Sequence, residues 1–419
     1  MRGNPLRAPI PSHVPPELVV EFDAYDPPGV DTGFHAAWHA FSTSGVPEIV
    51  WTPFNGGHWL ATSGRVVAAM YADSAKFSSR LLMVPKETVG ELFFSVPSSF
   101  DRPEHTPFRM LINAVLAPKL INQLENEIRG LARSLIAGFR ASGGCEFVEE
   151  FANILPIHIF MKLVDLPTSD IGKLKALNDH IVRPDGTMSV PEATAGLHNY
   201  LQSIVEARLG GNGTDGFSRM INGQVEGRAL TVEEAVLLAT TVLQGGIDTV
   251  SNLLSFMMHF LATSPEHRRQ LTEDPSILPA AVDEIARRFP VASLGREVKQ
   301  DIVYEGVDMR VGDMVIMPTA LHGLDERQNH DSMRVDFRRT ERSHSAFGQG
   351  PHRCPGAHIA RLEVRITIEE WLAQIPDFEL AEQDIHFRGG VVGTVDALPL
   401  RWNPAQAGAQ REDQAALVS

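Results

Sequence analysis

The chain is poor in cysteine, with only Cys145 and Cys354 among its 419 residues. Two cysteines form at most one bridge, which excludes the disulfide framework of small secreted proteins. The proline-rich first 16 residues also contain no apolar run long enough for a secretory signal. We therefore expect the protein in a reducing compartment, the cytoplasm.

Positive charge and long apolar runs are scarce as well. The 37 lysines and arginines are outnumbered by 52 acidic residues, which leaves a net charge of −15 and argues against a nucleic-acid partner. The most apolar stretch, 235–261, is interrupted at its centre by Gln244, Asp248 and Asn252. Because an ionisable group inside a membrane span is costly, we expect a buried helix there and no membrane partner.

No internal repeat and no Gly-, Ser- or Pro-rich linker divides the chain, so we expect one domain over residues 1–419. The proline-rich arm, 1–16, and the polar tail, 403–419, are expected to be poorly ordered.

What the chain does contain is a series of segments in which apolar residues recur every three or four positions. They predict helices over 66–71, 107–116, 121–142, 147–163, 191–208, 232–263, 265–271, 278–288 and 356–375. Strand patterns are short, at 47–54, 58–62, 302–303, 309–310 and 314–317. The predicted fold class is therefore mainly α with small β-sheets (α+β).

The most informative segment is SAFGQGPHRCPGAHIARLEV, which begins at Ser345. In it Cys354 follows two glycines and precedes a helical pattern. Backbone N–H groups and the dipole at a helix N-terminus favour a thiolate, the form of cysteine that binds metals. A buried structural cysteine is one alternative. The other is a zinc site, although the paired knuckle spacing is missing; its candidate ligands are His344, His352, Cys354 and His358.

This loop resembles the haem-binding segment of the cytochrome P450 family, Phe-Gly-x-Gly-x-His-x-Cys-x-Gly. The specified positions are filled by Phe347, Gly348, Gly350, His352, Cys354 and Gly356. The resemblance covers nearly the whole chain and is closest to the bacterial camphor hydroxylase branch. It implies a cytochrome P450 fold, one large helical domain with haem b buried between a long distal helix and the cysteine-loop helix. It also implies Cys354 as the thiolate ligand of the haem iron, with Phe347, Gly348 and Gly245 next to the cofactor.

Glu284 and Arg287 lie three positions apart on a predicted helix, so they share a face and can form a bidentate pair. On sequence alone, such a pair is usually a solvated surface contact. The resemblance implies a buried structural pair beneath the haem, joined by a third charged residue, for which Arg334 is the best match.

The glycines Gly245 and Gly246 interrupt the long predicted helix, where each costs about 1 kcal/mol relative to alanine. Close approach of a flat ligand or a helix crossing explains them. The resemblance implies the first, with Thr249 as the hydroxyl on the oxygen side and Asp248 as its partner in proton relay.

The two haem propionates need cationic or hydrogen-bonding partners. By resemblance these are His105, Arg109, Arg296 and His352, although any one of them alone reads as an ordinary surface charge.

Substrate-binding residues follow from the resemblance alone. Phe93 stands where the camphor hydroxylase has a tyrosine that binds the camphor ketone, and Gln244 replaces an apolar residue. Camphor is therefore expected to bind loosely, and a terpenoid of monoterpenoid or norisoprenoid size, such as an ionone, is expected instead. The candidates are Met83, Phe93, Phe94, Ser98, Thr241, Gln244, Ala292 and Val392.

The predicted function is that of an oxidoreductase, a haem-thiolate monooxygenase that hydroxylates such a terpenoid with dioxygen. The chain has no GxGxxG segment for a flavin or nicotinamide, so electrons are expected from a [2Fe–2S] ferredoxin and its reductase. Segment 334–363 has six arginines against three acids, a candidate docking face. The alternatives are a peroxide-using haem hydroxylase and a non-catalytic haem sensor; the Asp248–Thr249 pair favours the dioxygen enzyme.

Overall fold

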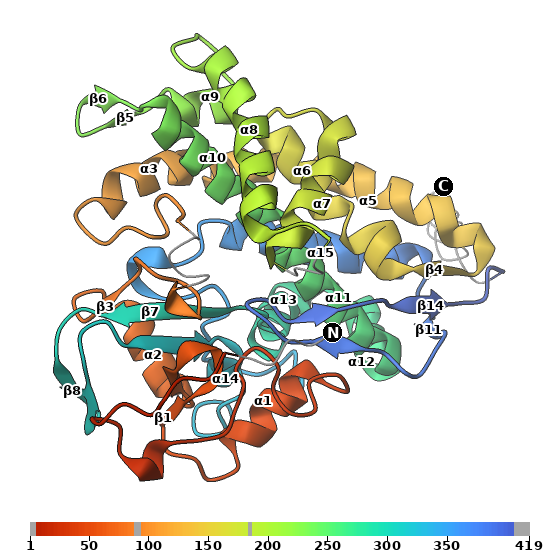
Figure 1. Cartoon of the computed structure of the whole chain (residues 1–419). Coiled ribbons are helices and arrows are strands. Elements are labelled where there is room, and N and C mark those ends of the chain that lie inside the picture. Colours follow the sequence, from red (N-terminus) through yellow and green to blue (C-terminus); the bar gives the residue numbers. More distant parts are fainter. Residues whose placement is uncertain (1–5, 88–93, 183–186, 406–419) are drawn as a thin grey trace.

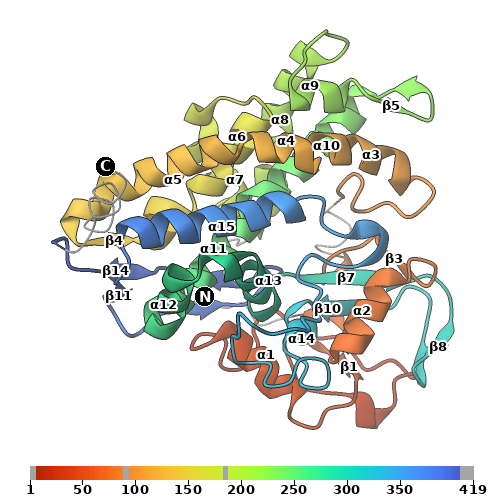
Figure 2. The same ribbon diagram turned by 180° about the vertical axis from the view of Figure 1, so that it is seen from behind.

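Two layers make up the part of the chain that the computed structural model describes, residues 6–87, 94–182 and 187–405. Figures 1 and 2 show a helical layer on one side, the largest β-sheet on the other, and α11, α13 and α15 between them. The helices are α1 (Phe34–Ser42), α2 (Gly64–Ala72), α3 (His105–Val115), α4 (Pro118–Gln123), α5 (Glu125–Phe139), α6 (Leu155–Leu163), α7 (Ile171–Val182), α8 (Val190–Arg208), α9 (Gly216–Ile221), α10 (Val232–Ile247), α11 (Thr249–Thr263), α12 (Pro265–Glu273), α13 (Leu278–Arg288), α14 (Ala320–Gly323) and α15 (Ala357–Gln374).

The sheets are small, as predicted. The largest has the order β1-β2-β10-β7-β3, with β10 parallel to β2 and the other pairs antiparallel. Its strands are β1 (Ile49–Thr52), β2 (His58–Ala61), β3 (Phe77–Ser78), β7 (Ser293–Val298) and β10 (Met314–Pro318). A second sheet joins β4 (Gly144–Glu146), β11 (Glu379–Leu380) and β14 (Pro399–Arg401), and three hairpins join β5 (Gln224–Val225) to β6 (Arg228–Ala229), β8 (Ile302–Tyr304) to β9 (Val307–Met309), and β12 (Phe387–Arg388) to β13 (Thr394–Val395).

Two buried apolar clusters form the core, and they meet at one point of the chain. The first includes side chains of the large sheet, α1, α2, α5, α11, α13 and α15. The second fills the space between α3, α6, α8, α9 and α10 and ends at Ile247, whereas the first resumes at Val250. The α10–α11 junction therefore lies where the two halves of the core meet.

The predicted fold class is confirmed, and several element boundaries differ. The helix predicted over 278–288 is α13, and the capping box of Thr231 and Glu234 begins α10. The continuous helix predicted over 232–263 is wrong, because Asp248 breaks it into α10 and α11. Helices α1, α7, α9 and α14 and the central strand β7 were not predicted.

The amino-terminal arm does not match the expectation of poor order over residues 6–16. The Ala8 N–H donates to the Pro53 carbonyl over 2.9 Å, and His13 lies 2.9 Å from the carboxylate of Asp313. Val14 is buried. Prolines restrict the arm to an extended path that packs along the sheet. Among the helices of the described ranges, none is both long and apolar enough to cross a membrane.

Candidate functional site

Cys354 ends a tight loop that leads into α15. Its backbone N–H donates to the Phe347 carbonyl over 2.7 Å. Gly348 and Gly350 have φ angles of 66° and 64°, which glycine adopts without strain. At Gly350 an added Cβ would lie 2.9 Å from the Cα of Ala72 on α2, so a side chain is excluded. The loop holds the thiol in one place while leaving it accessible.

The groups around the Cys354 sulfur act on its charge in opposite directions. Although the residue has accessible surface, the surrounding protein displaces bulk water, and this burial raises the thiol pKa above its usual value. The backbone N–H of Gly356 and the charges of Arg109 and Arg361 lower it, as the loop sequence predicts, but they do not outweigh burial. A metal ion bound at this thiol would supply the missing stabilisation, because coordination deprotonates a thiol outright.

The zinc alternative is wrong, because its candidate ligands do not come together and two of its three histidines have other partners. His344 Nδ1 accepts a hydrogen bond from the Ala346 N–H over 3.2 Å, and His358 Nε2 lies 2.7 Å from Asn122 Oδ1. Within the described part of the chain, no three His, Cys, Asp or Glu side chains form a group that could hold a metal ion.

Glu284 and Arg287 form the buried pair on α13. Arg287 donates to the carboxylate through Nε and Nη2, both over 2.8 Å, and both side chains are 0% exposed. Arg287 also donates to the carbonyls of Gly323, Ser332 and Arg334, over 2.6, 2.8 and 3.1 Å. Each buried charge therefore has a hydrogen-bonded counterpart, as a buried ion pair requires.

The predicted third member of this pair, Arg334, is wrong. Its side chain is 70% exposed, and its acidic neighbour is Asp331 at 3.9 Å. The carboxylate of Glu284 pairs instead with Arg339 at 3.2 Å and Arg342 at 3.7 Å. Arg334 contributes only its backbone carbonyl, which accepts a hydrogen bond from Arg287. The loop directs the Arg334 side chain to solvent and places the Arg339 side chain next to Glu284.

The four predicted propionate partners include a close pair at the cysteine loop. The rings of His105, at the start of α3, and His352, in the loop, lie 4.2 Å apart. Arg109 follows one turn later on α3 and donates to the backbone carbonyl of Arg353. Arg296 on β7 is 3% exposed, and its charge lowers the pKa of His352.

This cluster contains polar atoms without protein partners. Both ring nitrogens of His105 and Nε2 of His352 are buried without a hydrogen bond. Burial and then the charge of Arg296 lower the pKa of His352 to about 3, and burial and then Arg109 lower that of His105 to about 4. Two neutral imidazoles and two guanidinium groups are a donor set that suits two carboxylates, so these residues fit haem propionates.

The α10–α11 junction is opened by side chains that bind backbone carbonyls. Asp248 has φ −115° and ψ −40°. The Thr249 hydroxyl donates to the Gly245 carbonyl over 3.3 Å, and Asn252 Nδ2 donates to the Asp248 carbonyl over 3.0 Å. Such bonds compete with the helix ladder and bend it. The Asp248 side chain is 6% exposed, whereas Thr249 keeps part of its surface.

The two glycines of α10 have different roles. An added Cβ at Gly246 would lie 2.7 Å from the Phe160 ring, so this glycine permits the crossing of α10 and α6. Nothing lies within 4 Å of an added Cβ at Gly245. Gly245 is exposed although α10 packs against α6, α7, α8 and α9, which leaves room for a flat ligand beside it.

The predicted substrate residues come from distant segments. Ala292 and Val392 are paired in an isolated antiparallel bridge. The Thr241 hydroxyl lies 2.6 Å from that of Ser95, which was not predicted and is 146 positions away. No local pattern reveals such a contact. Phe94 is 46% exposed; Met83, Ser98 and Gln244 are partly exposed, and Phe93 lies outside the described residues.

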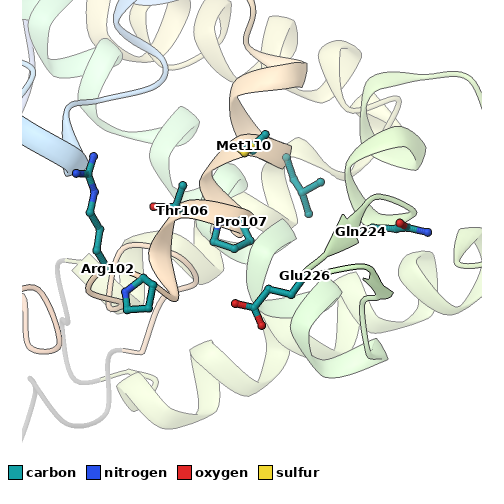
Figure 3. Close-up of a pocket in the computed structure, with 8 residues that line it drawn as sticks. Arg102, Thr106, Pro107, Met110, Gln224 and Glu226 are labelled. Atoms are coloured by element: carbon teal, nitrogen blue, oxygen red, sulfur yellow. The ribbon is translucent and has the colours of Figure 1, made fainter.

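A separate groove of about 1060 Å³ lies on the surface between α3 and the β5–β6 hairpin. Figure 3 shows Met110 and Pro107 of α3 on one side of it and Gln224 and Glu226 on the other. None of the predicted substrate residues lines it, so this groove is not the predicted substrate site.

The sequence and the fold of this chain are similar to those of known proteins. The cytochrome P450 family model matches residues 190–383, which include Asp248, Glu284 and Cys354. The probable cytochrome P450 127A1 of Sinorhizobium fredii is 30% identical over 94% of this chain and 97% of its own length. The crystal structures of CYP101J2 and of cytochrome P450 CYP101C1 are 42% and 37% identical, with TM-scores of 0.88 and 0.87, and each comparison covers 94% of this chain and 100% of the other. They confirm the resemblance to the camphor hydroxylase branch.

Proposed function

The chain belongs to the cytochrome P450 family, and we propose that it hydroxylates a small hydrophobic terpenoid with electrons from a [2Fe–2S] ferredoxin. As a family member it is a monooxygenase that binds haem through a cysteine thiolate and uses dioxygen, a substrate and a redox partner. The proposal concerns the substrate class, the ferredoxin, a cytoplasmic location and the role of each residue.

One observation carries the assignment of residues: an accessible thiol at Cys354 lies next to a basic cluster. In this cluster Arg109 donates to the Arg353 carbonyl, and buried ring nitrogens of His105 and His352 have no partner among the described residues. Cys354 Sγ would hold the haem iron, with Phe347 and Gly348 shaping the loop and Gly245 leaving room on the other face. The propionates would accept hydrogen bonds from His105, Arg109, Arg296 and His352. Bound there, the haem supplies the iron centre at which dioxygen is reduced.

The chain contributes proton delivery through Asp248 and Thr249. Thr249 Oγ1 holds its proton toward the Gly245 carbonyl at 3.3 Å, on the face of α10 that stays open. A small rotation of the side chain would turn that proton to the open side, and the buried Asp248 carboxylate would relay a replacement proton from solvent. One oxygen atom enters a C–H bond of the substrate, and the other leaves as water.

The substrate proposal is supported by the pocket residues. Met83, Phe94, Ala292 and Val392 would make an apolar lining with few polar groups, as is typical of a small-molecule site. At Phe93 the hydroxyl that binds the camphor ketone in the related hydroxylase is missing, and a ketone without a partner loses on the order of 1 kcal/mol or more. A molecule of monoterpenoid or norisoprenoid size with a different shape, such as an ionone, fits this composition better than camphor.

The basic surface proposed to bind the ferredoxin is smaller than the number of arginines in segment 334–363 indicates. Of the six arginines in segment 334–363, Arg339 and Arg342 pair with Glu284, and Arg361 pairs with Asp283 at 2.8 Å. The exposed Arg353 lies next to the cysteine, and a negatively charged ferredoxin would dock over it.

A paired titration tests the proposed substrate class. Camphor and an ionone are added to the ferric holoprotein while the haem spin state is read, and products are then analysed with ferredoxin, reductase and NAD(P)H. We expect tighter binding and cleaner oxidation of the ionone. The opposite order would show that the Phe93 argument is wrong. Turnover with peroxide alone would favour the peroxide-using alternative, and binding without any product would favour the sensor.

A further inference from the structure

One face of α10 stays partly exposed although the helix packs among four others. The residues along it are Leu237, Thr241, Gln244, Gly245 and Thr249, and most positions between them are buried. Steps of three and four residues place them in a single stripe on the helix. The stripe ends at the α10–α11 junction, so it borders the space into which a substrate must enter to reach Thr249.

Hydrogen-bond donors are unequally available along this stripe. The Thr241 hydroxyl has one proton and two acceptors within reach, the Leu237 carbonyl at 3.1 Å and the Ser95 hydroxyl at 2.6 Å. Whichever acceptor takes it, this proton is already used, and Thr241 can offer an approaching molecule only a lone pair.

Gln244 differs from these hydroxyls, because no hydrogen bond joins its amide to another described residue. Its carboxamide carries two N–H donors and one acceptor. It follows Thr241 by three positions and precedes Thr249 by five, so it occupies the middle of the stripe. Along the stripe it is the side chain that supplies free N–H donors.

We propose that Gln244 determines substrate specificity by donating a hydrogen bond to a ketone or ether oxygen of the terpenoid. This inference rests on the proposed function and makes it narrower: the substrate is an oxygenated terpenoid, and its oxygen is an acceptor. The rise of about 1.5 Å per residue places Gln244 roughly 7 Å along the helix from Thr249. The oxidised carbon is therefore expected at the far end of the molecule from its oxygen.

Carvone and limonene test the proposal, because they share one carbon skeleton and differ by a ketone. The dissociation constants of both are measured by calorimetry on the wild-type holoprotein and on Gln244→Leu, which keeps the size and removes the amide. We expect the ratio of the limonene constant to the carvone constant to fall about tenfold in the variant. We also expect oxidation of carvone at its isopropenyl end in the wild type and a mixture of products in the variant.

Two further variants separate specificity from packing. Gln244→Glu keeps acceptor oxygens without the amide donor and is expected to behave like Gln244→Leu. Thr241→Val removes a hydroxyl whose proton is already used, so it is expected to change both dissociation constants by the same factor.

The outcomes distinguish the two proposals. If both terpenoids bind and are oxidised but the ratio and the products are the same in the wild type and in Gln244→Leu, Gln244 does not recognise the oxygen and only the inference fails. If neither terpenoid binds the haem-loaded protein but the ionone does, the inference fails alone. If the ionone also neither binds nor is oxidised, the proposed function fails, and the inference fails with it.

Discussion

The cysteine-loop side and the α10 side of the site are built in different ways. On the cysteine-loop side, the groups behind the loop are bound to one another: Glu284 has two arginines within 3.2 Å, and His322 contacts Ser345 and Gln328 over 2.7 Å each. Buried ring nitrogens of His105 and His352, where the propionates would bind, lack partners among the described residues. On the α10 side, the Gln244 amide makes no hydrogen bond with a described residue. A fixed group needs a rigid frame of bonded side chains, here called the rigid side, whereas a changing ligand needs donors that are still free.

The largest expected effect is the loss of the buried charge pair on the rigid side. Glu284→Ala leaves Arg287 buried without its counterion, and we expect a loss of about 3–5 kcal/mol in the free energy of unfolding, measured by urea denaturation. Arg334→Ala is the matched control, because its exposed side chain is expected to contribute less than about 0.5 kcal/mol. Equal losses in both variants would contradict the reassignment of the third charge to Arg339.

On the α10 side, the expected effects are on catalysis and not on stability. Thr249→Ala should bind substrate normally but divert much of the reducing power to peroxide, because the proton donor is missing. Asp248→Asn should slow turnover by about 100-fold. The measurements are product and peroxide formed per NAD(P)H. Unchanged product yield in both variants would exclude the proton relay.

Acid should affect the rigid side through its buried histidines. Burial lowers the pKa of His344 from 6.5 to about 4. Because the unfolded chain takes up this proton at a higher pH than the folded protein, stability is complete above pH 6.5 and is lost as the pH falls toward 4. Between pH 7 and pH 5 we expect this residue to account for about 2 kcal/mol of lost stability. His344→Asn keeps an acceptor for the Ala346 N–H without titrating, so its unfolding free energy should fall less over that range; identical slopes for variant and wild type would refute this.

The smallest effect is expected at the surface above the rigid side. Arg353→Glu should raise the KM for ferredoxin roughly fivefold at low salt and make it less sensitive to ionic strength. Arg401→Glu, a change of the same charge at an exposed residue on β14, should leave the KM unchanged. If the KM for ferredoxin rose in Arg401→Glu and stayed unchanged in Arg353→Glu, ferredoxin would dock on a different face.

The difference between the rigid side and the α10 side also explains which parts of the site can be predicted from the sequence. Short motifs with their own geometry predict the rigid side: the glycines at 348 and 350 need positive φ, and the spacing of Glu284 and Arg287 allows a pair on one helix face. The sequence does not distinguish Arg334 from Arg339 as the third charge, because four arginines lie within the nine positions 334–342 and only the path of the loop decides which side chain reaches Glu284.

The helix break and the Ser95 contact on the α10 side depend on tertiary contacts that cannot be predicted from the local sequence. The apolar periodicity of 232–263 continues through Asp248, so it predicts one helix. The break follows from Thr249 and Asn252 binding carbonyls of the preceding turn. Ser95 meets Thr241 across 146 positions. The sequence pattern does not predict strand β7, because Arg296 is charged although it is buried, and a charged residue is not expected within an interior strand.

The central claim is that Cys354 holds a haem iron as a thiolate, and the absorption spectrum of the reduced protein under carbon monoxide tests it most directly. We predict the red-shifted band of thiolate ligation in the wild type. We predict its loss in Cys354→Ser, while Cys145→Ser keeps it. A wild-type protein that contains zinc and no haem, or a band that persists in Cys354→Ser, would contradict the assignment.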